Sequence, residues 1–276
     1  MKLHRQAERF GHIEHPRDLF RSKGNAFAEP IDSIDQQLGI SDGLKEQADR
    51  LDMAFDVRPD GSVVVTETIT WRFPEGEERH GILRNVQVRA GYRDSEDTYR
   101  YYELSGVSVT SPSGAPTDIA ISDFGAYRQI RIGSPSQTIT GTADYVVTYR
   151  LEHIVNDIGD GTAEFYYDLV DTSNGFPQRQ VTSSVTGPVA ATRAACFYGV
   201  LGSTASCTAT AGQTTTVSVP DLEAGEGASV ANDMFGIFPM VDQLGGFHYG
   251  DDNTFPPMVV ATRPETPSTQ PHQTPG

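Results

Sequence analysis

The run VVVTETITWRF, residues 63–73, is the sequence feature that most restricts the fold. Apolar and polar residues alternate through it, which predicts a β-strand with one apolar face that another layer of the protein must cover. The run MAFDV, residues 53–57, precedes it, and the turn-forming Pro59-Asp60-Gly61 separates the two runs. Together they predict a β-hairpin that opens an ordered domain. The apolar face consists of Val63, Val65, Ile69, Trp71 and Phe73.

Further strand-like runs follow, separated by turn residues at a spacing typical of a β-sandwich. Thr, Val, Ser and Gly are abundant and strongly helix-forming stretches are few, which favours strands over helices. We therefore predict a mainly β protein, with an antiparallel β-sandwich over residues 50–232. The further runs cover residues 99–109, 118–122, 127–132, 143–155, 163–170, 180–185 and 214–219.

The two ends of the chain lack this alternation. Residues 1–48 mix charges, glycines and isolated apolar residues, so we expect a loosely ordered, flexible arm. Residues 233–262 form an irregular segment, and residues 263–276 are a Pro/Thr-rich tail that cannot bury apolar surface and is expected to be disordered. No run reaches the roughly 20 apolar residues of a membrane-spanning helix, and the start lacks the apolar core of a signal peptide. We expect a soluble chain, with membrane association only through sequence beyond these residues.

The net charge excludes one class of partner. A formal charge of −16 and a pI near 4.7 would repel the phosphate backbone, and no cluster of Lys and Arg offsets this locally. Nucleic acid is therefore excluded as a partner, and an anionic membrane surface is disfavoured for the same reason. Cys196 and Cys207 fit neither a zinc site nor a redox C-x-x-C pair. We predict neither a metal site nor a cofactor.

A few residues carry weak signals of chemistry or binding. His80 could act as an acid or base near neutral pH, but a turn histidine bonded to the backbone is the favoured interpretation. Tyr99, Tyr101 and Tyr102 could stack on a sugar or a peptide, or could simply cap the core. Trp71 is expected to pack in the core. No G-x-S-x-G turn is present, so no nucleophile triad is predicted.

Glu67 interrupts the apolar face of the strand over residues 63–73, and Arg84 interrupts a second apolar row over residues 82–88. A turn at residues 74–77 would place Ile69 opposite Ile82 and Glu67 opposite Arg84 in one hairpin register. We therefore predict that Glu67 and Arg84 form a structural ion pair. The alternative is that Glu67 is a catalytic acid, but an adjacent arginine would lower its pKa and favour the structural role.

Four linked segments resemble a known bacterial family. DGSVVVTETITWRF, ERHGILRNV, CFYGVLGSTASC and PDLEAGEGASV occur in the order and spacing of the amino-terminal domain of domain of unknown function 2207, or YciQ-like predicted membrane proteins. The resemblance covers residues 53–231. It implies an extracytoplasmic β domain of a membrane-associated envelope protein with no established activity. The chain departs from the family pattern before residue 49 and after residue 231, and it lacks the tryptophan of the family's ELYW-type strand at residues 164–167.

The envelope setting that the resemblance implies is oxidising, and two glycines lie between Cys196 and Cys207. We therefore predict a disulfide between them, two reduced and half-buried cysteines being the alternative. The predicted function is a non-enzymatic interaction or structural domain on the extracytoplasmic side, whose partner is an unidentified protein or envelope glycan. The alternative is a carbohydrate-active or hydrolytic domain that uses carboxylates; a pocket gathering Asp and Glu would favour it.

Overall fold

The computed structural model describes residues 45–92, 95–157, 162–235 and 260–262. Every regular element within these ranges is a β-strand, and the same ranges contain no helix that is long and apolar enough to cross a membrane. The predicted mainly β class is confirmed. The strands form four sheets, one of seven strands, one of five and two of three.

The seven-stranded sheet contains the hairpin predicted at the start of the domain. β1 (Gln47–Val57) and β2 (Val63–Arg72) are antiparallel neighbours, with Val57 opposite Val63. Alternate residues of β2 are buried, as its apolar face requires. The sheet order is β15-β16-β12-β1-β2-β9-β6. Its other strands are β6 (Glu103–Thr110), β9 (Thr142–Glu152), β12 (Val181–Thr186), β15 (Thr208–Thr210) and β16 (Thr214–Ser218).

The other three sheets are smaller. The five-stranded sheet has the order β10-β11-β17-β13-β14, and the three-stranded sheets have the orders β3-β8-β7 and β18-β5-β4. The five strands are β10 (Val155–Asp157), β11 (Thr162–Val170), β13 (Ala191–Gly199), β14 (Ala205–Ser206) and β17 (Gly227–Phe235). The remaining strands are β3 (Ile82–Gln87), β4 (Arg89–Tyr92), β5 (Ser95–Tyr101), β7 (Ile119–Phe124), β8 (Tyr127–Ile132) and β18 (Val260–Thr262).

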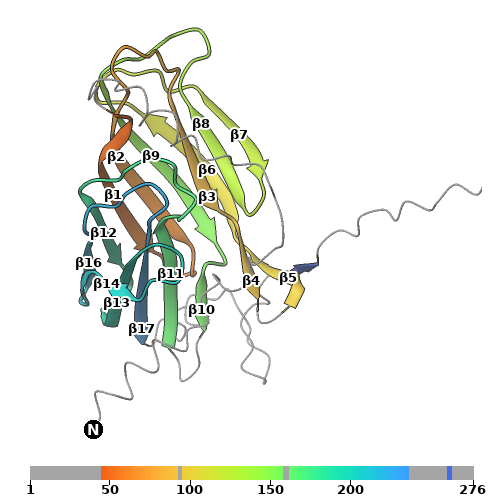
Figure 1. The fold of residues 1–276 in the computed structure, drawn as a ribbon. Coiled ribbons are helices and arrows are strands. Elements are labelled where there is room, and N and C mark those ends of the chain that lie inside the picture. The colour runs from red at the N-terminus through yellow and green to blue at the C-terminus, as the bar shows by residue number, and fades with distance from the viewer. Residues whose placement is uncertain (1–44, 93–94, 158–161, 236–259, 263–276) are drawn as a thin grey trace, which may run out of the picture.

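The seven-stranded sheet packs by one face against two of the smaller sheets (Figure 1). Phe55 on β1 lies 5.0 Å, between ring centroids, from both Phe165 and Tyr167 on β11. Arg84 on β3 contacts Glu67 on β2 across the second of these interfaces. The predicted sandwich is confirmed, and its second layer is composed of the five-stranded sheet and the β3-β8-β7 sheet.

The disulfide ties two parts of this sandwich together. Cys196 on β13 is bonded to Cys207, and their Cα atoms lie 5.0 Å apart. Cys207 stands between β14, which belongs to the five-stranded sheet, and β15, which belongs to the seven-stranded sheet. The predicted disulfide is therefore confirmed, and it holds the point at which the chain crosses between the two layers.

The predicted pairing of β2 with β3 is wrong. β2 is bonded to β1 on one side and to β9 on the other, and β3 pairs with β8 in a different sheet. Both edges of β2 are therefore occupied, and residues 74–81 carry the chain from one layer to the other. The sheet is also not purely antiparallel, because β1 and β12 run parallel.

Strand boundaries differ from the prediction at several places. The predicted strand over residues 99–109 is divided at Tyr102, so β5 and β6 lie in different sheets. β1 begins at Gln47, inside the predicted arm 1–48, and β17 ends at Phe235, past the predicted end of the sandwich at residue 232.

The predictions for the two ends of the chain concern mostly residues that the structure does not describe. Most of the predicted arm 1–48, most of the segment 233–262 and all of the tail 263–276 lie outside the described residues.

Candidate functional site

Glu67 is the centre of a buried polar cluster between the two layers. Its side chain points into the sandwich with the apolar residues of β2 and is fully buried. Arg84 Nε donates a hydrogen bond to Glu67 Oε2 at 2.6 Å, and Tyr149 Oη donates to Glu67 Oε1 at 2.7 Å. Tyr167 lies 3.1 Å from Tyr149 between the hydroxyl oxygens. Both carboxylate oxygens of Glu67 therefore have a donor.

The pKa values of the three groups around Glu67 shift in directions that keep Arg84 charged and both tyrosines neutral. Burial opposes the charge of Arg84, but the adjacent carboxylate of Glu67 raises the pKa of Arg84 above its usual value. Burial and the same carboxylate raise the pKa of the Tyr149 and Tyr167 hydroxyls. The cluster is therefore an ion pair with two neutral phenols around it. An arginine held this firmly in its charged form favours the structural role of Glu67 that the sequence predicted.

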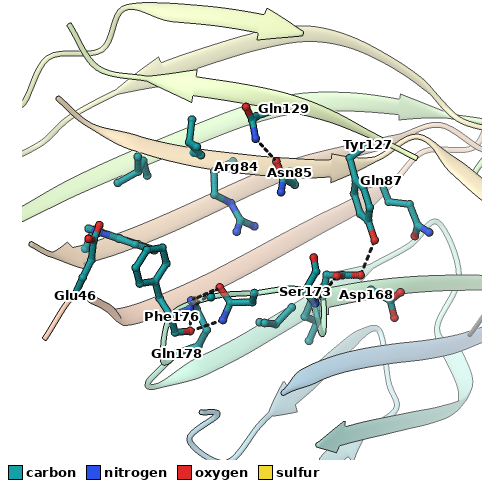
Figure 2. Close-up of a pocket in the computed structure, with 18 of the residues that line it drawn as sticks. Glu46, Arg84, Asn85, Gln87, Tyr127, Gln129, Asp168, Ser173, Phe176 and Gln178 are labelled. Atoms are coloured by element: carbon teal, nitrogen blue, oxygen red, sulfur yellow. Dashed lines mark hydrogen bonds between the residues drawn. The ribbon is translucent and has the colours of Figure 1, made fainter. Parts of the chain in front are cut away.

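A cleft of about 460 Å³ opens above this cluster, between the two parts of the second layer (Figure 2). One wall is β3 with Tyr127 and Gln129 of β8; the other is the end of β11 with the segment 171–178 that follows it. Figure 2 shows the Arg84 side chain directed into the space between these walls. Amide, hydroxyl, carboxylate and aromatic groups line the cleft together.

Hydrogen bonds hold the polar groups at one end of the cleft. Tyr127 Oη donates to Asp171 Oδ2 at 2.5 Å, and the Ser173 backbone N–H donates to Asp171 Oδ1 at 2.7 Å. Within the wall formed by β3 and β8, Gln129 Nε2 donates to Asn85 Oδ1 at 3.1 Å. Burial, and then the bond to Asp171, raises the pKa of the Tyr127 hydroxyl. Tyr127 therefore remains a neutral donor to the Asp171 carboxylate.

The opposite end of the cleft is aromatic. Trp71 and Phe176 meet edge to face with their ring centroids 5.5 Å apart. Trp71 Nε1 donates to Glu46 Oε1 at 3.1 Å, and Arg79 Nε donates to Glu46 Oε2 at the same distance. Trp71 is 7% exposed, so its predicted place in the core is confirmed at the boundary between core and cleft.

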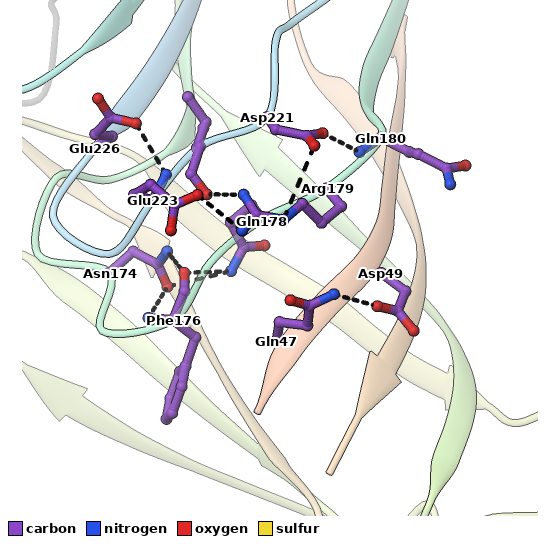
Figure 3. Close-up of polar contacts among 11 residues, drawn as sticks. Gln47, Asp49, Asn174, Phe176, Gln178, Arg179, Gln180, Asp221, Glu223 and Glu226 are labelled. Atoms are coloured by element: carbon purple, nitrogen blue, oxygen red, sulfur yellow. Dashed lines mark hydrogen bonds and ion pairs between the residues drawn. The ribbon is translucent and has the colours of Figure 1, made fainter. Parts of the chain in front are cut away.

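Hydrogen bonds and an ion pair to Leu222 and Glu223 hold the segment 171–178, which forms the second wall (Figure 3). Gln178 and Leu222 exchange two backbone hydrogen bonds of 2.9 Å. Arg179 donates through Nη1 to the Leu222 carbonyl at 2.9 Å and forms an ion pair with Glu223 at 2.8 Å. Inside the turn, Asn174 Nδ2 donates to the Phe176 carbonyl. These contacts fix the position of this wall.

His80 lies outside the large cleft. Its Nδ1 is 3.2 Å from the Ser134 carbonyl oxygen and 3.0 Å from that of Gln137. Carbonyl oxygens only accept, so Nδ1 carries the proton and is shared between them. His80 lines a neighbouring hollow of about 180 Å³, which shares Gly81, Ile82 and Leu83 with the large cleft. The structure therefore places it as the backbone-bonded turn histidine.

Of the three tyrosines predicted as a stacking surface, Tyr102 is buried in the core. Tyr99 and Tyr101 belong to β5, and the Tyr99 side chain is outside the described part of the structure. Tyr102 follows β5, is 6% exposed, and donates its backbone N–H to the Val88 carbonyl. Burial raises the pKa of its hydroxyl. Tyr102 therefore belongs to the core, because the chain changes sheets at this residue.

One group of potential metal ligands occurs among the described residues. Single ligand atoms of Glu103, Glu152 and His153 lie within 4.8 Å of one another near the start of β6 and the end of β9. The sequence predicted no metal site, and this group is separate from the cleft. Glu152 already accepts a hydrogen bond from Arg150 Nε at 3.1 Å.

Sequence reasoning identified two residues that line the cleft, Trp71 and Arg84, and missed the others. Tyr127 lies 44 residues before Asp171, which closely follows Asp168, and no local motif contains all three. Only the pairing of the strands brings them together. The sandwich alternation places residues in a layer, but it does not show where two sheets of one layer separate.

The comparisons with known proteins identify a family. No curated protein matches the sequence. The native yeast LTA4 hydrolase structure aligns at 9% identity with a TM-score of 0.40, over 75% of this chain and 33% of that chain. An M1 zinc metallopeptidase from Deinococcus radiodurans aligns at 13% identity with a TM-score of 0.35, over 68% of this chain and 42% of that chain. The chain thus spans less than half of either structure.

The family comparison covers most of the domain. The family model described as the N-terminal domain of predicted membrane proteins, DUF2207, matches residues 47–233. These limits nearly coincide with the start of β1 and the end of β17. They overlap every strand that forms the two layers. The chain therefore belongs to the DUF2207 family of predicted membrane proteins, of which this is the N-terminal domain.

Proposed function

We propose that this chain is a non-enzymatic binding domain of a membrane-associated envelope protein, and that it holds its partner in the cleft between β3 and β11. The single observation that carries the proposal is the cleft itself. Its volume of about 460 Å³ is in the range of known ligand sites, about 300–1,000 Å³. Aromatic rings at one end and fixed polar groups at the other provide both contact area and orientation.

The state of the carboxylates supports binding rather than catalysis. A general acid or base needs a carboxylate that can exchange a proton with the substrate. Glu67 accepts from Arg84 and Tyr149, Asp171 from Tyr127 and Ser173, and Glu46 from Trp71 and Arg79. Each of these acids therefore already accepts hydrogen bonds from protein donors, which occupy the oxygens that a substrate proton would need.

The disulfide supports an extracytoplasmic location. Disulfides persist in oxidising compartments and are rare in the reducing cytosol. The Cys196–Cys207 bond is part of the frame of this domain, since it joins the two layers where the chain crosses between them. Family membership supplies the membrane context, because the family is described as predicted membrane proteins.

One observation favours the alternative, a hydrolytic domain acting on envelope glycans. Asp168, Asp171 and Glu46 are gathered in one cleft with Trp71 and Phe176. Glycoside hydrolysis uses a pair of carboxylates, and aromatic rings beside them can stack on a sugar. Of these acids Asp168 is the best candidate, although its Oδ1 already accepts from Tyr166 Oη at 3.0 Å.

Trp71 provides the test, because it is the only tryptophan in the chain and lines the cleft. Its fluorescence is followed while the full chain is titrated with soluble peptidoglycan fragments and with short extended peptides. The same mixtures are then analysed for products by mass spectrometry. Saturable binding of either probe without turnover is the expected result. Turnover that is lost in Asp168→Asn or Asp171→Asn would establish the hydrolytic alternative.

A pair of variants locates the binding. Ser173 is exposed at the wall of the cleft, so Ser173→Tyr fills the cleft and should abolish the fluorescence change. Thr138 is also exposed but lies outside the cleft, so Thr138→Tyr should leave the fluorescence change intact. Equal effects of the two variants, or no saturable signal with any probe, would contradict binding in this cleft.

A further inference from the structure

β3 is the end strand of its sheet. Among the strands that the structure describes, β3 is bonded to β8 on one side and has no strand on the other. An end strand presents backbone N–H and C=O groups to any chain that approaches in an extended conformation.

The hydrogen bonds at both ends of the sheet show which residues of β3 present these backbone groups at the open edge. Val88 N–H donates to the Ala126 carbonyl, which makes these opposite residues a hydrogen-bonded pair. Bonded and non-bonded pairs alternate along an antiparallel ladder, so Gln87, Asn85 and Leu83 belong to non-bonded pairs. On the other edge of β8, the Gly133 N–H donates to the Asp118 carbonyl, so Gly133 and every second residue before it bond toward β7. The β8 residues between them bond toward β3, which agrees with this alternation. The backbone polar groups of Leu83, Asn85 and Gln87 therefore point away from β8.

The same three residues line the cleft. Leu83 is 55% exposed, which is unusual for a large apolar side chain at a sheet edge. The open edge of β3 and the cleft are thus one feature, with the wall of residues 168–178 opposite. A groove bordered by an open strand edge fits an extended polypeptide, because its backbone can pair with the edge along its length.

The charges of the cleft select the kind of segment. Arg84 gives its Nε to Glu67, and its two terminal nitrogens have no hydrogen-bond partner among the described residues. Since Glu67 neutralises the charge of Arg84, these N–H groups suit neutral carbonyl oxygens of a backbone. Asp168 and Asp171 add negative charge at the wall, and the whole chain carries −16. This balance favours basic side chains on the incoming segment.

We propose that the cleft binds an extended, basic polypeptide segment of another protein, which adds as a strand to the open edge of β3. This rests on the proposed binding function and specifies its partner class and its mode. Backbone pairing with β3 supplies affinity, Arg84 donates to a backbone carbonyl of the segment, and the acidic wall selects basic side chains. A glycan would make no regular backbone pairs, so the two partner classes differ in a measurable way.

The probe acetyl-Lys-Val-Lys-Val-Lys-Val-amide tests the mode without altering the protein. In an added strand, alternate N–H groups of the probe pair with β3 and the others point away. N-methylation at alternate residues should weaken binding in one series by about tenfold or more per lost hydrogen bond, and by much less in the other series. The acidic counterpart acetyl-Glu-Val-Glu-Val-Glu-Val-amide should bind more weakly than the basic probe.

A matched pair of variants tests the edge of β3 itself. Asn85→Pro removes the N–H that faces the cleft and leaves the bonds between β3 and β8 intact. Asn85→Ala removes the bond to Gln129 but keeps this N–H. Binding of the basic probe should fall about tenfold or more with Asn85→Pro and change little with Asn85→Ala.

The outcomes separate the mode from the proposed function. If the probe binds and both N-methyl series weaken it equally, or neither does, strand addition is wrong while binding in the cleft stands. If Asn85→Pro does not fold, the N-methyl series decides alone. If only peptidoglycan fragments bind, the partner is a glycan and the polypeptide proposal is overturned. If the acidic probe binds as tightly as the basic one, the charge selection is overturned.

Discussion

Arg84 and Glu67 form an ion pair between two sheets, with Arg84 Nε 2.6 Å from Glu67 Oε2. The two side chains meet as the sequence predicted, but not across a hairpin, because β2 and β3 belong to different layers. Each charge interrupts an apolar row, and in both cases the row faces the core. The Glu67 side chain is 1% exposed and that of Arg84 is 19% exposed.

The first prediction concerns this pair. Arg84→Ala should lower the free energy of unfolding by about 3–5 kcal/mol, because it leaves the buried Glu67 carboxylate without its counter-charge. Urea denaturation at neutral pH measures the change. Arg128→Ala is the control, since it removes an exposed pair with Asp123 and should cost under about 1 kcal/mol. Equal costs for the two variants would show that the Glu67–Arg84 pair adds nothing by being buried.

One property of the alternating pattern explains both the correct and the wrong predictions for β2. Alternation shows which face of a strand is buried, so Trp71 and Glu67 could be placed correctly from β2 alone. It does not show which strand lies beside it. β2 takes β9 as its second neighbour, more than 70 residues along the chain, and the nearby β3 pairs elsewhere. Local turn signals cannot reveal such long-range pairing.

β17 shows a second limit. Its buried residues include Ser229, Asn232 and Asp233, so the polar-apolar alternation that marks a strand is absent. Asn232 accepts a hydrogen bond from Thr215 at 2.7 Å, and Asp233 forms an ion pair with Arg193 at 2.5 Å. These partners compensate for burial but lie on other strands. The cleft was unpredictable for the same reason, because its walls come from separate sheets.

The second prediction concerns the disulfide. Replacing both Cys196 and Cys207 by alanine should lower the free energy of unfolding by about 2–3 kcal/mol, the amount that closing a short loop contributes in the chain-entropy model. Denaturation of the oxidised parent and the double variant measures it, with the reduced parent as the control. Maleimide labelling of the protein in its native cells should find both thiols blocked until a reductant is added. Free thiols before reduction would contradict both the bond and the extracytoplasmic location.

The third prediction is a pH dependence caused by Glu164. Burial, and then the nearby Asp233, raises the pKa of Glu164 above its usual value. The folded protein therefore holds this proton more tightly than the unfolded chain does. The resulting stabilisation is complete below the unfolded pKa of about 4.3 and is lost as the pH rises through the folded pKa. Glu164→Gln should remove this dependence and be more stable than the parent at neutral pH.

Denaturation curves at a series of pH values test this. The exposed Glu75 is the matched control, and Glu75→Gln should leave the pH dependence of unfolding unchanged. A parent and a Glu164→Gln variant whose stabilities differ by the same amount at every pH would exclude a role for Glu164 ionisation.

The last prediction concerns the close contact between Gly81 and Gly133 beside His80. A Cβ on Gly81 would lie 1.8 Å from the Ile132 carbonyl oxygen, and a Cβ on Gly133 would lie 2.0 Å from that of His80. Gly81 also has a φ of 142°, which side chains rarely adopt. These two constraints explain why the chain has glycine at both positions where it passes from one layer to the other.

Gly81→Ala should therefore lower the free energy of unfolding by more than about 3 kcal/mol, since backbone atoms and not a flexible side chain must move. Gly76 is the control, because it has a φ of 76° but nothing within 4 Å of a Cβ. Gly76→Ala should cost only the backbone strain of about 1–2 kcal/mol. Because Gly81 lines the cleft, the Gly81→Ala displacement should also disturb the edge of β3 and weaken binding of the basic probe. Equal stability losses for Gly81→Ala and Gly76→Ala would mean that the close contact can open at no cost.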